Sequence, residues 1–218
     1  MFEYGGVKIS WLGHDCFKIK DDCTIYIDPF QILRGEKADL ILVTHEHFDH
    51  LSPEDIKKIT TKETTIVAPK IAESGLKGIP CKEVVIIKPG ETKEMKGVKI
   101  QAVPAYNINK FRAPGQVFHP KEDGRVGYVV NVKGVTIYHA GDTDAIPEVK
   151  GLSVDIALLP VSGTYVMTAD EAIELANTIK PKVAIPMHYG AIVGSEADAK
   201  RFKDGVKGRV EILQKETE

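Results

Sequence analysis

The stretch Thr44-His45-Glu46-His47-Phe48-Asp49-His50 gathers three of the chain's seven histidines, with carboxylates between them. In an extended segment His45 and His47 project to the same side, while Asp49 and His50 return from the next turn. One cation can take the first pair of side chains and a second cation the other pair. Imidazole and carboxylate suit zinc, manganese, iron or nickel, and the lack of thiolates argues against a closed structural zinc site. The stretch therefore predicts an open, catalytic metal site.

The residues on either side indicate where this stretch lies in the fold. Residues 40–43 form an apolar run typical of a buried strand, and residues 52–55 indicate the start of a helix. Ser52 is the expected N-cap and Pro53 the first helical residue. The histidines are thus expected at the carboxyl end of a strand, just before a helix. The alternative is a solvated loop or a surface tract that scavenges metal.

The pattern His45-x-His47-x-Asp49-His50 resembles the signature of the metallo-β-lactamase superfamily. The chain is similar to its branch of small metal-dependent hydrolases that includes the ascorbate-phosphate lactonases. The resemblance runs from Trp11-Leu12-Gly13-His14 through Tyr138-His139-Ala140-Gly141-Asp142-Thr143 to Pro186-Met187-His188-Tyr189-Gly190, so it covers nearly the whole chain. It implies an α+β fold, a four-layer αββα sandwich, formed as a single hydrolase domain over residues 1–218.

Composition agrees with a globular enzyme. A chain of 218 residues with 43% hydrophobic content can bury one sizeable core or a compact pair of half-domains. The net charge of −2 gives no overall cationic surface for nucleic acid, so a small-molecule substrate is expected.

The first residues lack a signal-peptide pattern and no apolar run is long enough to span a membrane, which predicts a cytoplasmic protein. Cys16, Cys23 and Cys81 lack CxxC spacing and are expected to be free, buried hydrophobes.

Short β-rich runs punctuated by glycine and proline dominate the rest of the chain. Helices are predicted after the capping box that starts at Thr168 and after Ser195. The first three strands are expected to form an antiparallel meander. The predicted strands cover residues 7–11, 16–20, 24–27, 40–43, 65–68, 83–87, 98–103, 127–132, 135–138, 155–159, 183–185 and 210–213.

Polar side chains recur just after these strands. Sheets of this kind commonly place their sites at the carboxyl ends of strands, so we expect these side chains to converge. For any one of them, a capping carboxylate or a buried structural histidine is the simpler explanation; for the whole set, convergence is the better one. The residues are Asp28, His45, Asn107, His139, Asp142 and His188.

The family resemblance assigns roles within the cluster. It implies two divalent cations, zinc first and manganese, iron or nickel as alternatives. Two adjacent cations lower the pKa of a shared water, supply hydroxide and polarise the substrate oxygen, so that no separate strong base is required. The ligands would be His45 and His47 for the first cation, Asp49, His50 and His188 for the second, and Asp142 as the bridge.

Other residues are expected around the ligands. Asp28 resembles a carboxylate that holds a ligand imidazole in the right tautomer. His14 resembles a position that faces the site, where it binds substrate or delivers a proton to the leaving group. His139 is expected to be structural or to support a ligand. Tyr165 and Tyr189 are candidate contacts for the substrate or an oxyanion.

One position departs from the family pattern. Many relatives have histidine where this chain has Asn107, which leaves open the third ligand of the first cation. Asn107 can bind through its amide oxygen, His119 can fold back in its place, or the position stays open to water. We favour the open or Asn107-bound arrangement, because His119 lies twelve residues further along a loop whose path the sequence does not fix.

The loop of residues 109–121 also carries Lys110 and Arg112. These cations predict a lid for an anionic substrate, although a solvated basic loop explains them equally well.

The sequence thus favours a metal-dependent hydrolase of a small, anionic ester, lactone or phosphodiester. A phosphodiesterase or nuclease of the same fold is the alternative, although the chain has no broad basic face. Diiron redox chemistry is disfavoured, since it calls for glutamate in place of His47. A non-catalytic metal-binding scaffold is supported only by Asn107.

Overall fold

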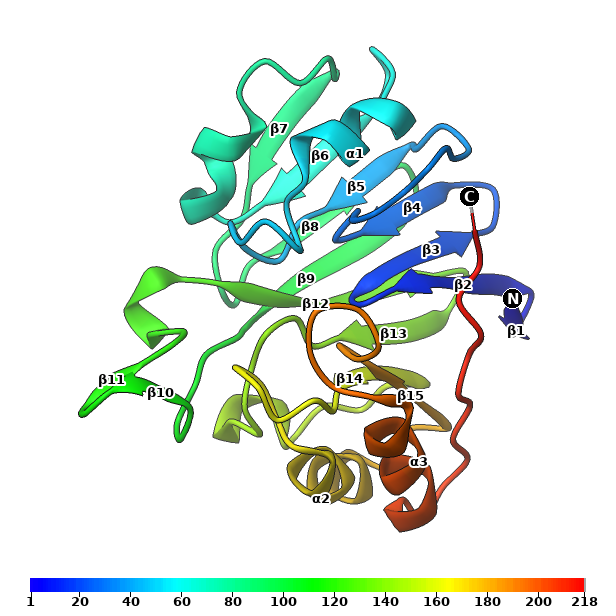
Figure 1. Ribbon diagram of the computed structural model, residues 1–218. Helices are drawn as coiled ribbons and strands as arrows, with labels where there is room; N and C mark the ends of the chain where they lie inside the picture. The colour runs from blue at the N-terminus through cyan, green and yellow to red at the C-terminus, as the bar shows by residue number, and fades with distance from the viewer. Residues whose placement is uncertain (218) are drawn as a thin grey trace.

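A computed structural model describes residues 1–217, and two stacked β-sheets form its centre. The first sheet has strand order β1-β2-β3-β4-β5-β6-β7, and the second has the order β15-β14-β13-β12-β9-β8 (Figure 1). The strands of the first sheet are β1 Phe2–Tyr4, β2 Val7–Gly13, β3 Cys16–Lys20, β4 Thr24–Ile27, β5 Leu40–Leu42, β6 Thr65–Ala68 and β7 Glu83–Ile86. Those of the second are β8 Thr92–Met95, β9 Val98–Pro104, β12 Val126–Val132, β13 Val135–His139, β14 Ile156–Pro160 and β15 Val183–Met187.

Helices cover the outer face of each sheet. On the first sheet lie α1 Pro53–Ile59 and the 3₁₀ turn η1 Lys70–Leu76, and on the second lie α2 Ala169–Ile179 and α3 Glu196–Gly205 (Figure 1). Two shorter 3₁₀ turns are η2 Lys121–Asp123 and η3 Pro147–Val149. This is the predicted four-layer αββα arrangement. Among the described residues, no helix is long and apolar enough to cross a membrane.

The apolar side chains of the first sheet divide between its two faces. In β4, Ile25 and Ile27 face the main core between the sheets, whereas Tyr26 packs with Ile41 and Ile56 in a second core beneath α1. Successive side chains of a strand point to opposite faces, so a sheet covered on both sides needs unbroken apolar strands. This explains the continuous apolar runs seen in the sequence.

Strand direction brings the polar residues together. In the first sheet β2, β3 and β4 form the predicted antiparallel meander, and β4, β5, β6 and β7 are parallel. In the second sheet β13, β14 and β15 are parallel. The carboxyl ends of parallel strands share one edge of a sheet, so Asp28, His45, Asp142 and His188 follow strands that end together.

Local capping agrees with the sequence. The Ser52 hydroxyl accepts a hydrogen bond from the Asp55 N–H at the start of α1, with Pro53 as the first helical residue. Thr168 and Glu171 form the predicted capping box at the start of α2. The three cysteines are free, as expected, and only Cys81 is partly exposed.

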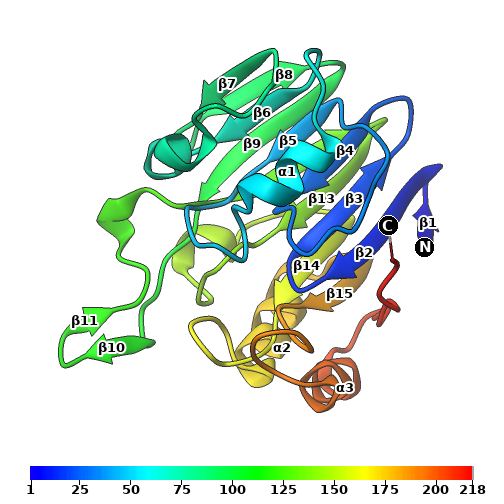
Figure 2. The same cartoon turned by 45° about the horizontal axis from the view of Figure 1, so that its top comes forward.

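Some elements differ from prediction. The strand expected over residues 210–213 is wrong, because this segment forms only an isolated bridge between Val210 and Ala184. The short edge strands β1 and β8 were not predicted. The hairpin of β10 Phe111–Ala113 and β11 Gln116–Val117 was not predicted either, and it projects away from the sheets (Figure 2). These strands are short and largely polar, so they lack the apolar alternation that reveals a strand.

Candidate metal centre

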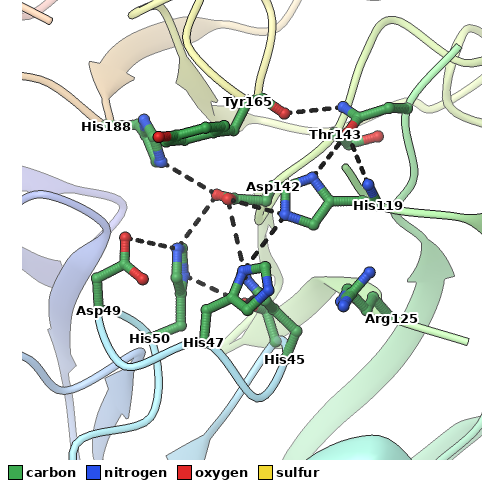
Figure 3. Close-up of polar contacts among 12 residues, drawn as sticks. His45, His47, Asp49, His50, His119, Arg125, Asp142, Thr143, Tyr165 and His188 are labelled. Carbon is green, nitrogen blue, oxygen red and sulfur yellow. Dashed lines mark hydrogen bonds and ion pairs between the residues drawn. The ribbon is translucent and has the colours of Figure 1, made fainter. Parts of the chain in front are cut away.

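Two groups of ligand atoms meet at the carboxyl ends of the strands, with the Asp142 carboxylate between them (Figure 3). In the first cluster, His45, His47, His119 and Asp142, the Nε2 atom of His45 lies 3.0 Å from Nδ1 of His47. The Nε2 atom of His119 lies 3.4 Å from that Nδ1 and 3.4 Å from Oδ2 of Asp142. Tetrahedral zinc with bonds of 2.0–2.1 Å separates its ligands by about 3.3 Å. The spacing of the first cluster therefore fits a single cation.

Hydrogen bonds on the far side of the ring orient two of the three imidazoles of the first cluster. Thr44 donates its hydroxyl to Asp28, which leaves its oxygen to accept from Nδ1 of His45 at 3.0 Å. The Oδ1 atom of Asn107 accepts from Nδ1 of His119 at 2.8 Å. The rings of His45 and His119 then carry their protons outward and present bare nitrogens to the centre. These nitrogens lie 3.0 and 3.4 Å from Nδ1 of His47, a spacing that suits ligands of a shared cation.

The second cluster, formed by Asp49, His50 and His188 with Asp142, lies on the other side of the Asp142 carboxylate. Its Oδ1 atom is 3.2 Å from Nε2 of His50 and 3.3 Å from Nε2 of His188, and Oδ2 of Asp49 is 3.7 Å from Nε2 of His50. Within the described residues these two nitrogens and Oδ1 of Asp142 are buried without a hydrogen-bond partner. Buried polar atoms are rarely left unpaired, so this convergence fits a second cation.

The outward nitrogens of the second cluster are also held. The Asp28 carboxylate lies 2.8 Å from Nδ1 of His50 and also accepts the backbone N–H of Thr44 at 2.7 Å. This is the contact predicted for Asp28. Nδ1 of His188 lies 2.8 Å from the hydroxyl oxygen of Ser162. Both rings therefore direct Nε2 toward Asp142.

The two clusters differ in protonation. Burial lowers the pKa of His45 well below its usual value and that of His119 to about 4. In the second cluster burial also opposes the charged form, but the neighbouring carboxylates outweigh it. Asp142 and Asp28 raise the pKa of His50 well above its usual value, and Asp142 and Asp15 raise that of His188 to about 9. Without metal, the imidazoles of the first cluster are neutral, and those of His50 and His188 carry protons.

A buried arginine fixes the loop that carries the first two histidines. Arg125, only 6% exposed, pairs with both carboxylate oxygens of Glu46 and with Asp123. A two-pronged pair of this kind restricts rotation of the residue between His45 and His47.

Comparison with known proteins places this site in a family. The profile of a family described as Beta-lactamase superfamily domain matches residues 8–188. The chain belongs to the beta-lactamase superfamily. It is 35% identical over 209 residues to a UPF0173 metal-dependent hydrolase of Thermoplasma acidophilum, with 90% of this chain and 89% of that protein covered.

Solved structures agree on the fold of this superfamily member. A protein of Parabacteroides distasonis described as a candidate metal-dependent hydrolase is 32% identical, with a TM-score of 0.78 and coverage of 95% of this chain and 94% of the other. The diiron β-hydroxylase CmlA of Streptomyces venezuelae is 15% identical, with a TM-score of 0.73 and coverage of 98% of this chain and 54% of CmlA. At that identity CmlA shows the fold alone.

The structure departs from our expectation for the first cluster. It brings His119, not Asn107, among the ligand atoms. The Asn107 oxygen accepts from both the backbone N–H and Nδ1 of His119, at 2.9 and 2.8 Å. The Asn107 amide nitrogen donates to Asp144 and to the carbonyl of Tyr165. The Asn107 oxygen thus accepts two hydrogen bonds from His119, and the amide nitrogen donates elsewhere. No oxygen lone pair of Asn107 is directed to the cluster.

Two other predicted histidines are buried. Nε2 of His14 lies 3.0 Å from Oδ2 of Asp49, and its ring packs 4.2 Å from that of His188. His14 is 1% exposed and does not line the cavity at the site, so its contacts suit the orientation of Asp49 better than proton delivery to a leaving group. His139 accepts from the Gly141 N–H and donates to the carbonyl of Asp15, which is the structural role expected for it.

A cavity of about 270 Å³ opens onto the clusters. Its lining combines ligand residues with an apolar rim. The lining residues are His47, Phe48, Asp49, Phe118, His119, Asp142, Tyr165 and Ile192. Tyr165 therefore lies where a substrate contact was predicted. Tyr189 does not, because its ring stacks on Trp11 at 4.9 Å and lines a different groove.

The predicted cationic lid is not at this cavity. The Lys110 ammonium is held by the Glu171 carboxylate at 2.7 Å and lies 3.4 Å from Asp144. Arg112 belongs to the projecting β10–β11 hairpin and is exposed there. Neither residue lines the cavity. The sequence did not reveal that Lys110 is neutralised, because Glu171 lies 61 residues away.

Some residues of the site were missed by sequence reasoning. Arg125, Ser162 and Phe118 have no local pattern that marks them. Thr44 and Asp15 do have one, since each directly adjoins a histidine of a quoted motif.

Proposed function

We propose that this protein hydrolyses a small ester, lactone or phosphodiester at two divalent cations held by the two clusters. The observation that carries the proposal is the convergence of five imidazoles and Asp49 around the shared Asp142 carboxylate, with Nε2 of His50, Nε2 of His188 and Oδ1 of Asp142 buried without a hydrogen-bond partner among the described residues. When bound, the cations would activate a water molecule and polarise the scissile group. The three imidazoles of the first cluster favour zinc there.

The chain leaves one side of the cluster accessible. His45, His50 and His188 are at most 1% exposed, whereas His47 and Asp49 line the cavity. A substrate can reach the centre from this cavity. Its volume of about 270 Å³ suits a small molecule, since ligand pockets usually start at about 300 Å³. Nucleic acid is disfavoured because the cavity lining contains no lysine or arginine.

The rim determines which part of the substrate this chain can recognise. Phe48 is 67% exposed, and Phe118 packs edge-on against Tyr165 at 4.7 Å. These rings, together with Ile192, offer an apolar surface beside the cluster. An apolar acyl or aryl group next to the scissile bond would bury surface there. The substrate's negative charge, if present, would have to face the cations, because Lys110 is already paired with Glu171.

The test is a set of p-nitrophenyl esters of increasing acyl length, aryl lactones and bis-p-nitrophenyl phosphate. Each is assayed with chelated protein and after zinc, manganese, iron or nickel is restored. We expect activity that requires metal and a KM that falls as the apolar group grows. Hydrolysis that survives complete removal of metal, or that persists in Asp142→Ala, would refute the proposal.

Two matched variants test separately how the apolar rim of the cavity and the basic loop of residues 109–121 contribute to substrate binding. Phe118→Ala should raise KM for the longer ester by about tenfold, since a buried ring contributes about 1.5 kcal/mol or more. Lys110→Met should change KM for anionic substrates less than about threefold, because the Glu171 pair is remote from the cavity. A large KM effect of Lys110→Met on anionic substrates alone would restore the predicted lid.

A further inference from the structure

Asp15 is a carboxylate that the ligand set described above does not include. It is fully buried, and neither of its oxygens has a hydrogen-bond partner among residues 1–217. Its Oδ2 atom lies 3.5, 3.6 and 3.8 Å from the Nε2 atoms of His14, His50 and His188. Two of these nitrogens belong to the second cluster. Asp15 therefore points at the same centre as Asp142 and Asp49.

Buried aspartates outside the clusters, such as Asp28 and Asp144, are hydrogen-bonded. Asp28 accepts from Thr44 and lies within hydrogen-bond distance of His50, and Asp144 accepts the backbone N–H groups of Ile108 and Asn109. An isolated carboxylate buried without such bonds costs many kcal/mol unless a cation compensates it. The contrast indicates that Asp15 has a partner of another kind.

The backbone on either side of Asp15 is fixed, so the side chain cannot easily turn away. Asp15 lies between β2 and β3, directly after His14, whose φ is +52°. The carbonyl of His14 accepts from the Trp11 indole at 2.8 Å and from the backbone N–H of His188 at 3.2 Å. The carbonyl of Asp15 accepts from His139 at 2.9 Å. One local contact and two contacts from distant parts of the chain hold this turn against the cluster.

We propose that Asp15 is a further ligand of the cation in the second cluster, an inference that rests on the two-cation site proposed above. The ligand atoms Asp15, His50, Asp142 and His188 all lie within 4.8 Å of one another. With Asp49, the second cation has three carboxylates and two imidazoles, while the first has one carboxylate and three imidazoles. Oxygen-rich sites with many ligands favour manganese, and imidazole-rich sites favour zinc. The protein would then hold two different metals.

The experiment titrates chelated wild type and Asp15→Asn with Mn²⁺, with free Mn²⁺ followed by electron paramagnetic resonance, and with Zn²⁺ by calorimetry. We expect Asp15→Asn to weaken Mn²⁺ binding at least about tenfold and to change the tightest Zn²⁺ site less than about threefold. His119→Ala is the matched control. It should weaken the tightest Zn²⁺ site at least about tenfold and change Mn²⁺ affinity less than about threefold. The rise in Tm on adding Mn²⁺ should shrink by about 3 to 5 °C in Asp15→Asn, which also shows that the variant folds.

The outcomes separate the two proposals. Wild type that binds two cations, with Asp15→Asn equal to it in Mn²⁺ affinity and in the Tm shift, overturns the role of Asp15 alone. Wild type that binds no cation overturns both this role and the proposed function. Equal loss of Mn²⁺ and Zn²⁺ affinity in Asp15→Asn also contradicts the assignment, because it would indicate a general disturbance of the turn.

Discussion

The two clusters share Asp142 and the stretch 44–50, but their remaining histidines come from different parts of the chain. The second cluster takes His50 and His188 from segments that follow strands, and their outward nitrogens lie beside Asp28 and Ser162 in the protein interior. The first cluster takes His119 from the long connection between β9 and β12, and Asn107 of the same connection holds it. Segments that follow strands thus position His50 and His188, whereas a loop positions His119. The position of His119 therefore depends on the path of that loop.

The clusters also differ in charge before metal binds. The imidazoles of the first have lowered pKa values, while His50 and His188 of the second have raised ones. Imidazole binds metal only after losing its proton from the ligand nitrogen. The second cluster must release protons to bind a cation, and the first need not.

The largest loss of metal affinity is expected for a substitution of Asp142, the residue that the two clusters share. Asp142→Ala removes the carboxylate common to both, so it should weaken both cations by more than about 100-fold, beyond what supporting residues usually cost. Metal content after dialysis against a weak chelator measures this. The control is Asp170→Ala, an exposed carboxylate on α2 paired with Arg201. Retention of either cation in Asp142→Ala would show that the carboxylate is not shared.

Single-ligand variants should separate the clusters. His119→Ala should remove the first cation and leave the second, and His188→Ala should do the opposite, with about one cation per chain remaining in each case. Chelator competition with Zn²⁺ distinguishes the two. If His119→Ala kept both cations, the loop would not supply a ligand and the difference between strand and loop positions would disappear.

Variants of the two residues that hold ligand rings form a matched pair with smaller expected losses of metal affinity. Asn107→Ala frees the ring of His119, and Asp28→Asn weakens the hold on His50. Each should lower affinity by about 10- to 100-fold, the first only at the first cluster and the second mainly at the second. Zinc titration monitored by calorimetry resolves the two steps. Tighter binding in Asn107→His would instead favour the arrangement that we expected from the sequence.

The pH dependence of binding should differ between the clusters. Since the pKa of His188 is about 9, its proton must leave at pH 7, and affinity at the second cluster should rise about tenfold per pH unit for each proton released, between pH 6 and 8. The pKa of His119 is about 4, so affinity at the first cluster should stay nearly flat over that range. Zn²⁺ titrations in buffers of different ionisation enthalpy count the protons. Equal slopes at both clusters would contradict the assigned protonation.

Short sequence patterns, namely apolar runs and the motif of residues 44–50, predicted much of the fold and of the ligand set. The apolar runs mark the strands, and the stretch 44–50 follows one of them directly. The pairing of Asp28 with an imidazole was expected from the family resemblance, and the structure places Asp28 after β4, which runs parallel to the strand before the histidines. The strands themselves could be predicted because side-chain alternation and apolar runs are visible in the sequence.

The misassigned residues depend on contacts between distant segments. His119 reaches the cluster because its loop folds back onto Asn107, and no local pattern fixes that path. Lys110 looked available until Glu171 was found beside it. Tyr189 adjoins a ligand in sequence, but its ring turns to Trp11. Loop paths and long-range pairing therefore limit what sequence alone can predict of this site.

The most direct test of the two-cation centre is the metal content of the purified wild-type chain. Protein from metal-replete cells, and chelated protein reloaded with Zn²⁺ and Mn²⁺ and then desalted, would be analysed by inductively coupled plasma mass spectrometry. The account predicts about two divalent transition-metal ions per chain in both samples, because each cluster offers at least three ligand atoms besides Asp142. A chain that holds no such ion, or never more than one, would contradict it.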